Sequence, residues 1–188
     1  MANDLLLFAR QLFKNPFQVA AIAPSSRFLA RAMAAGLGPA TGPVVEFGPG
    51  TGQLTRGILA AGVTDLTLFE MSAEFVRLLQ SRFQGVTVQR AGAQEAASFI
   101  AKSSVGAVVS GLPLLSIPEP VVEAIMTAAF DVLRPNGVYI QFTYGPKAPV
   151  PDRIMAKLGL VAEAKQKIWL NVPPARVYHI RRIPPHTN

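Results

Sequence analysis

One stretch constrains the fold of this chain more than any other: residues 44–52, with the sequence VVEFGPGTG. Its apolar, β-branched start predicts a buried strand, and residues 51–61 predict a helix. Three glycines at alternating positions lie between the two, where the absence of Cβ lets the backbone turn sharply and lie flat against a ligand. A strand, a glycine turn and a helix in this order are typical of the nucleotide grip of doubly wound α/β folds.

The glycine spacing and two carboxylates narrow the class of ligand. The spacing is G-x-G-x-G, whereas a pyrophosphate needs a longer loop and a free helix N-terminus. Glu46 precedes the first glycine, where a negative charge disfavours a diphosphate and favours a cation such as an amino acid's ammonium group. Glu70 ends the next apolar segment, about 20 residues past the glycines, in the place of a ribose-binding acid. A ligand with a ribose, an ammonium group and no phosphate fits S-adenosylmethionine.

Beyond this motif, strand and helix patterns alternate. Strands are predicted over 65–70, 86–90, 105–110, 137–143, 161–170 and 176–182, and helices over 72–84 with Ser72 as cap, 94–102, 119–133 and 154–158. Alternating elements predict a parallel sheet with helices on both faces. The last two strands are close enough to form a hairpin, which makes the final strand antiparallel.

The segment before the glycine motif carries two further helical patterns. Residues 3–14 concentrate Leu and Phe on one face, so this helix either lies in a membrane interface or packs across the domain and helps to close the site. A second helix is predicted over 28–35. Ser25 is either its N-cap alone or, together with Arg27, part of an anion site. We divide the chain into a helical extension (1–36), a ligand-binding domain (37–183) and a loose tail (184–188).

Composition excludes several other classes of protein. The chain has 188 residues, which suffice for one domain, and half of them are hydrophobic, so it is not a disordered chain. It has no cysteine, hence no disulfide framework, and we expect no metal site. The N-terminus lacks a secretory pattern and no apolar run is long enough to span a bilayer, so we expect a cytoplasmic protein. The net charge of +7 favours a polyanionic partner, either nucleic acid or an anionic membrane surface.

The loop after the strand 105–110 is the expected acceptor side, because ligands in open α/β sheets bind beyond the strand C-termini at the switch point. It reads SGLPLLSIP over residues 110–118. This loop is strongly apolar, which suits a greasy substrate or, alternatively, a loop that only lines the core. Tyr144 follows the strand 137–143 and is our candidate for orienting an amine through its hydroxyl or its ring face; the alternative is a packing tyrosine.

The glycine motif followed by FEMS at 69–72 resembles motif I and the acidic motif of class I S-adenosylmethionine-dependent methyltransferases. The resemblance implies a Rossmann-like, seven-stranded, mostly parallel sheet with a C-terminal antiparallel hairpin, plus N-terminal helices. Motif I also resembles that of rRNA adenine dimethylases, which carry N-L-P-Y after the fourth strand. Here the Asn and Tyr positions are Gly111 and Leu114, so the amide and the aromatic face that recognise a flipped base are missing and an RNA acceptor is disfavoured.

Nearly the whole chain is similar to the small, soluble bacterial phospholipid N-methyltransferases, which methylate phosphatidylethanolamine. The similar segments are residues 15–33, the glycine motif, the loop at 110–118, LRPNG at 133–137 with QFTYGP at 141–146, and NVPPARVY at 171–178. The resemblance implies a peripheral membrane enzyme whose N-terminal helix binds anionic lipid, with no nucleic acid and no obligate protein partner. A soluble small-molecule amine remains an alternative acceptor.

The motifs and the resemblance together assign the site residues. The cofactor is assigned to Glu46, Gly48, Gly50, Thr51, Gly52, Glu70, Met71, Ala93, Gln94, Ser110 and Gly111, and the acceptor to Ser25, Arg27, Leu112, Pro113, Leu114 and Arg176, with Tyr144 as the catalytic candidate. The family commonly has Asp at the position of Ala93, where it contacts the adenine amino group. Gln94 or Glu95 is then the alternative contact in this chain.

Overall fold

Strands and helices alternate along the chain, as the sequence predicts. The computed structural model describes residues 26–144, 148–171 and 173–184. The strands are β1 (Val44–Phe47), β2 (Leu66–Phe69), β3 (Thr87–Gln89), β4 (Val105–Ser110), β5 (Leu133–Thr143), β6 (Leu160–Ile168) and β7 (Ala175–Arg182). The helices are α3 (Ser26–Met33), α4 (Gln53–Ala60), α5 (Ala73–Arg82), α6 (Glu119–Val132) and α7 (Asp152–Lys157), with 3-10 turns η2 (Pro39–Thr41), η3 (Ala93–Ser98) and η4 (Leu114–Ser116). The predicted helix over residues 3–14 lies outside the described residues.

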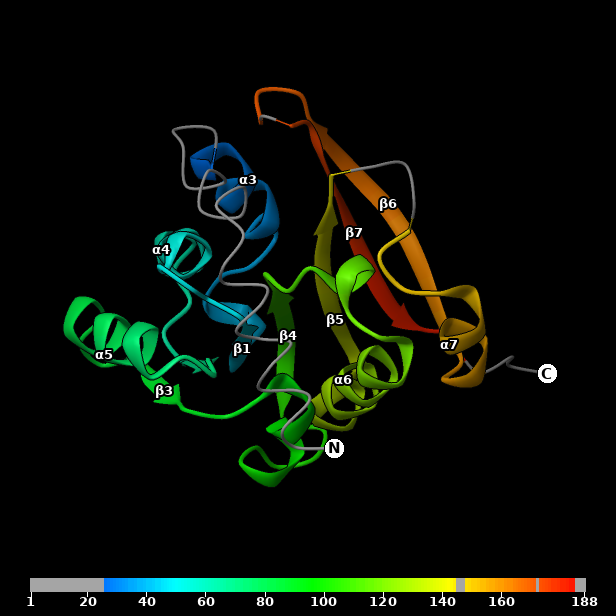
Figure 1. The fold of residues 1–188 in the computed structure, drawn as a ribbon, viewed down its shortest axis with the longest axis horizontal. Coiled ribbons are helices and arrows are strands. Elements are labelled where there is room, and N and C mark those ends of the chain that lie inside the picture. Colours follow the sequence, from blue (N-terminus) through cyan, green and yellow to red (C-terminus); the bar gives the residue numbers. More distant parts are fainter. Residues whose placement is uncertain (1–25, 145–147, 172, 185–188) are drawn as a thin grey trace.

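The seven strands form one sheet with the order β3-β2-β1-β4-β5-β7-β6 (Figure 1). Neighbouring strands from β3 to β5 are parallel, whereas β7 is antiparallel to both β5 and β6. The predicted seven-stranded sheet with a C-terminal antiparallel hairpin is therefore confirmed. Phe47 aligns with Phe69 on one side and with Ser110 on the other, so β1, β2 and β4 end at the same level. The residues that follow these three strands consequently meet at one edge of the sheet.

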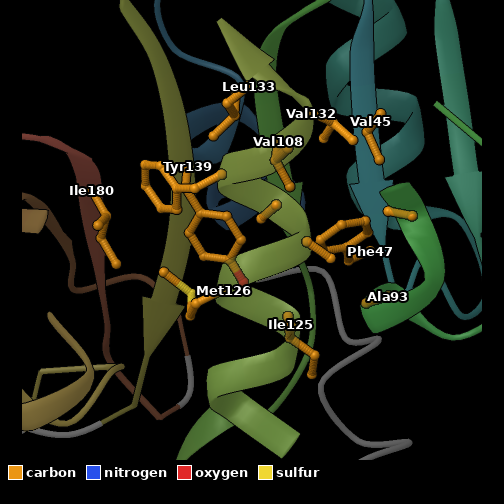
Figure 2. Packing of buried hydrophobic residues seen from close by; sticks show 14 of the residues in the cluster. Val45, Phe47, Ala93, Val108, Ile125, Met126, Val132, Leu133, Tyr139 and Ile180 are labelled. Atoms are coloured by element: carbon orange, nitrogen blue, oxygen red, sulfur yellow. The ribbon is translucent and has the colours of Figure 1, made fainter. Parts of the chain in front are cut away.

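Each face of the sheet buries its own apolar cluster. On one face, residues of β1, β4 and β5 pack against α6, η3 and α7; Figure 2 shows Met126 of α6 beside Tyr139 of β5, and Ala93 near Phe47. On the other face, α3, α4 and α5 cover a cluster that includes Met33, Ile58 and Leu79. α3 belongs to this second core, so the sheet is packed on both of its faces. No helix within the described ranges is both long and apolar enough to cross a bilayer.

Most elements differ from their predicted bounds by one to four residues, and three of the differences have identifiable reasons. The helix after the glycine turn begins at Gln53 because Gly52 has a φ of 84°, which a right-handed helix does not admit. The predicted helix over 94–102 is the 3-10 turn η3, whose buried residues Ala93 and Ala96 are three apart and therefore align in a three-residue repeat. β5 begins at Leu133, four residues early, because Leu133 pairs with Val105 before a register shift.

Candidate cofactor and acceptor site

The glycine turn is held in its sharp path by contacts from the residues that follow β2 and α5. Gly50 and Gly52 have φ values of 54° and 84°, in the left-handed region that favours glycine. The amide of Gly50 donates to the carboxylate of Glu70, and a Cβ added at Gly52 would overlap the ring of Phe83. A Cβ added at Gly50 meets nothing within 4 Å, so the turn is open on that side.

Glu70 spans the turn from the end of β2. One carboxylate oxygen accepts the amide of Gly50 at 3.1 Å and the other accepts the amide of Ser72 at 2.8 Å. Burial raises the pKa of Glu70, and these backbone hydrogen bonds act in the opposite direction. Each carboxylate oxygen has a second lone pair. The geometry thus fits a carboxylate that organises the turn and still accepts the hydroxyls of a ribose.

Glu46 is fully buried on the α4 side of β1. Its Oε2 accepts the hydroxyl of Thr55 at 2.7 Å, and its Oε1 has no hydrogen-bond partner in the described part of the chain. Burial, followed by the nearby charge of Glu70, raises the pKa of Glu46 to about 8, against the hydrogen bond from Thr55. The sequence interpretation of Glu46 as a standing negative charge is therefore incomplete, because the carboxyl is mostly protonated at neutral pH. A nearby cation restores its ionisation, so an unpartnered buried oxygen fits a ligand with an ammonium group.

We predict that Thr55→Val destabilises the protein by about 1–3 kcal/mol, because a fully buried carboxyl loses its side-chain hydrogen-bond donor and keeps only the backbone amide of residue 55. The same change raises the pKa of Glu46 further, since the hydrogen bond from Thr55 lowers it. Urea unfolding at pH 6 and pH 8 measures both effects. Thr127→Val, on the exposed side of α6, is the matched control and is expected to change stability by less than about 0.5 kcal/mol. If Thr55→Val and Thr127→Val changed stability equally, the Thr55–Glu46 hydrogen bond would not contribute to stability.

The loop after β4 lies directly against the glycine turn. The amide of Gly111 donates to the carbonyl of Phe47 at 2.8 Å, and a Cβ on Gly48 would lie 2.5 Å from Cδ2 of Leu112. Ser110, which is fully buried, accepts the amide of Leu112 at 3.3 Å. From β5, Nε2 of Gln141 donates to the carbonyl of Leu112 at 2.9 Å. The structure thus brings Gly48, Ser110 and Gly111 together, as the shared cofactor assignment requires.

The apolar loop divides into buried and exposed residues. Leu114 packs into the core beneath α6, whereas Pro113 is exposed and Leu112 is half-buried. Leu115, which is not among the predicted site residues, is exposed. The 3-10 turn η4 produces this division, because it points Leu114 inward and Leu115 outward. Leu115 is therefore better placed than Leu114 to meet an apolar acceptor.

The adenine contact is the least defined part of the cofactor assignment. Ala93 is a core residue beside Phe47, as Figure 2 shows, and the side chain of Gln94 folds back over Gly92. Glu95 accepts the amide of Gly92 at 2.8 Å, so it caps η3. Met71, directly after Glu70, is half-buried.

The remaining predicted residues lie around the ends of β5 and β7. Tyr144 is 41% exposed, its ring lies edge-on to Phe142 with centroids 5.2 Å apart, and burial raises its pKa against a hydrogen bond with Asn171. Arg176 is half-buried and shares a sheet face with Thr143. Arg27 is exposed on α3, which packs on the other face of the sheet. Ser25 lies outside the described residues.

Two residues that sequence reasoning missed hold the glycine turn in place. Nη1 of Arg82 donates to the carbonyl of Thr51 at 2.6 Å, and the neighbouring Phe83 packs against Gly52. Both are at the end of α5, some 30 residues from the turn, and no spacing in the sequence links them to it. Thr51 therefore contributes to this contact through its backbone carbonyl.

Comparisons with known proteins match the part of the chain that forms the glycine turn. A family model described as a methyltransferase domain matches residues 44–137. The chain is 28% identical to the ornithine lipid N-methyltransferase of Singulisphaera acidiphila over 192 residues, which cover 96% of this chain and 97% of that protein.

Solved structures of similar fold include two methyltransferases. One is the Burkholderia thailandensis 1,6-didemethyltoxoflavin-N1-methyltransferase with bound 1,6-didemethyltoxoflavin and S-adenosylhomocysteine, at a TM-score of 0.71, 14% identity, and coverage of 96% of this chain and 89% of that one. The other is geranyl diphosphate methyltransferase in complex with S-adenosylmethionine, at a TM-score of 0.64, 14% identity and coverage of 84% and 85%. At these identities the two structures show a shared fold. With the family match spanning the glycine turn, Glu46 and Glu70, the chain belongs to the methyltransferase domain family and has the fold of these class I methyltransferases.

Proposed function

We propose that the protein is an N-methyltransferase that methylates the amine of phosphatidylethanolamine, and of its methylated products, at a membrane surface. The observation that carries this proposal is the match over nearly the whole length to a relative named for N-methylation of a lipid. That relative's name makes ornithine lipid the second candidate acceptor. Both substrates belong to one class, an amine on a lipid headgroup.

The acceptor side of the site supports a lipid over a nucleobase. The loop after β4 exposes Pro113 and Leu115 beside the half-buried Leu112. A base acceptor outside a duplex needs an aromatic face and edge hydrogen bonds, but the corresponding positions here are Gly111 and the buried Leu114. Apolar side chains at this position suit the glycerol and upper acyl region of a lipid.

The residues present are suited to alignment more than to proton transfer. When bound, S-adenosylmethionine supplies an activated methyl group on a positively charged sulfur, with a neutral leaving group. A primary amine has a pKa of roughly 10 by analogy with lysine, so the acceptor must lose a proton before it attacks. Residues 110–118 contain no carboxylate or histidine, and burial raises the pKa of the Tyr144 phenol, which therefore stays neutral. Tyr144 then orients the amine, and solvent water accepts the proton.

The test is methyl transfer from labelled S-adenosylmethionine to vesicles that contain phosphatidylethanolamine, ornithine lipid or phosphatidylglycerol alone, with total RNA and ethanolamine as further arms. We expect label in phosphatidylethanolamine and none in phosphatidylglycerol or RNA. Label only in ornithine lipid would replace the first candidate by the second. Absence of label from every lipid, with S-adenosylhomocysteine still bound, would reject the proposal.

A tyrosine series tests the role of Tyr144. Because a cation over an aromatic face is worth about 0.5–2 kcal/mol, Tyr144→Ala is expected to lower kcat/KM by roughly twofold to thirtyfold, whereas Tyr144→Phe keeps the ring and most of the activity. Tyr178→Phe, on the neighbouring strand β7, controls for the loss of a hydroxyl elsewhere in the sheet. A loss in Tyr144→Phe as large as in Tyr144→Ala would show that the hydroxyl, not the ring, orients the amine.

A further inference from the structure

The β6–β7 hairpin ends at the same edge of the sheet as the cofactor and acceptor site. Thr143, at the end of β5, pairs with Arg176 of β7, which pairs with Lys167 of β6. These three neighbours share one sheet face. The turn that joins β6 to β7 extends past the end of β5. We call residues 167–171 and 173–176 the hairpin tip. In Figure 1 this tip projects beyond the ends of β4 and β5, on the side where α3 lies.

The tip carries the two most exposed large apolar side chains that the structure describes: Trp169 at 69% and Leu170 at 67%. Their exposure does not come from a loosely held turn. Asn171 is buried, its Nδ2 donates to the carbonyl of Pro173 at 2.7 Å, and its amide donates to the carbonyl of Ile168 at 3.3 Å. A well-anchored turn that holds two large apolar side chains in water is a mark of an interaction surface.

The charge around the tip is positive. Nζ of Lys167 lies 3.6 Å from the centroid of the Trp169 ring, and Arg176 is opposite Lys167. From Ala164 to the C-terminus the sequence contains no Asp or Glu. α3, which packs into the same core cluster as Ile168 and Ala175, adds the exposed Arg31. Tryptophan beside lysine and arginine, with an adjacent leucine, is the combination that suits the interface of an anionic bilayer.

We propose that the hairpin tip docks on an anionic bilayer, with Trp169 and Leu170 entering the interfacial region and Lys167 and Arg176 facing the lipid phosphates. This inference rests on the proposed function, since it places the acceptor side of the site against the headgroup layer. Tyr144 is linked to the tip through Asn171. Docking of the tip would therefore place Tyr144, at the end of β5, at the depth in the bilayer where the headgroup amines lie.

Trp169 is the single tryptophan of the chain, so its fluorescence reports directly on the tip. Vesicles of phosphatidylglycerol and phosphatidylcholine are expected to shift its emission to shorter wavelength and to protect it from aqueous quenchers. Pure phosphatidylcholine vesicles, or high salt, are expected to weaken both effects, because salt screens the charges. An emission spectrum that is already short in wavelength without vesicles, and that vesicles leave unchanged, would show that another segment covers the tip and would overturn the proposal.

Two variants that keep Trp169 test the surface by vesicle binding. Leu170→Asp and Lys167→Glu are each expected to weaken binding to phosphatidylglycerol vesicles by about tenfold or more. Val161→Asp is the matched control: Val161 is 49% exposed on the same strand, at the opposite end of the hairpin, and we expect no change. Wild-type vesicle binding by both tip variants would overturn the proposal.

The same variants separate this inference from the proposed function. Methyl transfer to short-chain phosphatidylethanolamine below its micellar concentration requires the site but no bilayer. If Leu170→Asp retains this activity and loses vesicle binding, the tip is the docking surface of a lipid methyltransferase. If the wild type docks through Trp169 but methylates no lipid, the docking surface stands and the proposed function fails. If lipid is methylated while Trp169 emission ignores the vesicles, the proposed function stands and the docking surface is rejected.

Discussion

Glu46→Gln is expected to remove most of the pH dependence of folding stability between about pH 5 and pH 8. The pKa of Glu46 is about 8 in the folded protein, against an ordinary value of 4.5 for a glutamate. The folded state therefore binds this proton more tightly than the unfolded state. The resulting stability is fully present below about pH 4.5 and is lost as the pH rises through 8. A difference of this size corresponds to on the order of 4–5 kcal/mol.

Urea unfolding at a series of pH values measures this effect. The wild type is expected to lose several kcal/mol from pH 5 to pH 8, whereas Glu46→Gln stays nearly level, apart from a smaller slope in the same direction from Glu70, whose pKa is also raised. Glu74→Gln, an exposed carboxylate on α5, is the control and should retain the wild-type slope. Parallel curves for the wild type and Glu46→Gln would show that Glu46 is ionised in the folded protein.

The same titration connects to the cofactor. Glu46 is the predicted partner of the ammonium group of S-adenosylmethionine, and a carboxyl with a pKa of about 8 is mostly protonated at pH 7. Binding of the ammonium group should then release a proton. Calorimetry of S-adenosylhomocysteine binding at pH 7, in two buffers with different ionisation enthalpies, is expected to show nearly one proton released by the wild type and close to none by Glu46→Gln.

Gly50→Ala is expected to abolish most cofactor binding while leaving the fold intact. An alanine at a φ of 54° costs about 1–2 kcal/mol of strain, and its methyl group meets no protein atom within 4 Å. The methyl group instead stands on the open side of the turn. We expect the affinity for S-adenosylhomocysteine to fall by tenfold to a hundredfold, equal to about 1.4–2.7 kcal/mol.

Gly85→Ala is the matched control for this prediction. Gly85 has a φ of 82°, its added Cβ also meets nothing within 4 Å, and it lies in the turn between α5 and β3. Both variants therefore carry comparable backbone strain, and thermal unfolding should show similar losses. Isothermal titration should separate them, because only Gly50 belongs to the predicted cradle. Unchanged affinity in Gly50→Ala would place the cofactor elsewhere.

The fold could be predicted from the sequence because its signals are local. Apolar strand patterns alternate with helical patterns along the chain. The glycines of residues 44–52 predict the ligand-binding turn after the first strand. The antiparallel hairpin followed from the short connection between the last two strands. The predicted start of an element was wrong where a single backbone angle or a non-local strand pairing sets it. Examples are the start of α4 after Gly52 and the start of β5 at Leu133.

The site was predictable in part. Glu46, Glu70 and the glycines occupy fixed positions within or beside one motif, so their meeting follows from strand register. The protonation of Glu46 does not, because it depends on complete burial against α4. The contact of Arg82 with the turn and the exposure of Trp169 could not be predicted from the sequence either, because both depend on where distant elements pack. The assignment of individual residues to cofactor and acceptor stays a prediction.

The strand β6 forms one border of the sheet, and its composition limits how the protein self-associates. Residues 163–167 are exposed in succession, with Glu163 ion-paired to Lys165 and with Lys167 nearby. A second copy that extended the sheet across this border would have to strip water from these charges along its whole contact. The free backbone groups of β6 are thus shielded from strand addition, and fibre-like growth from this border is disfavoured.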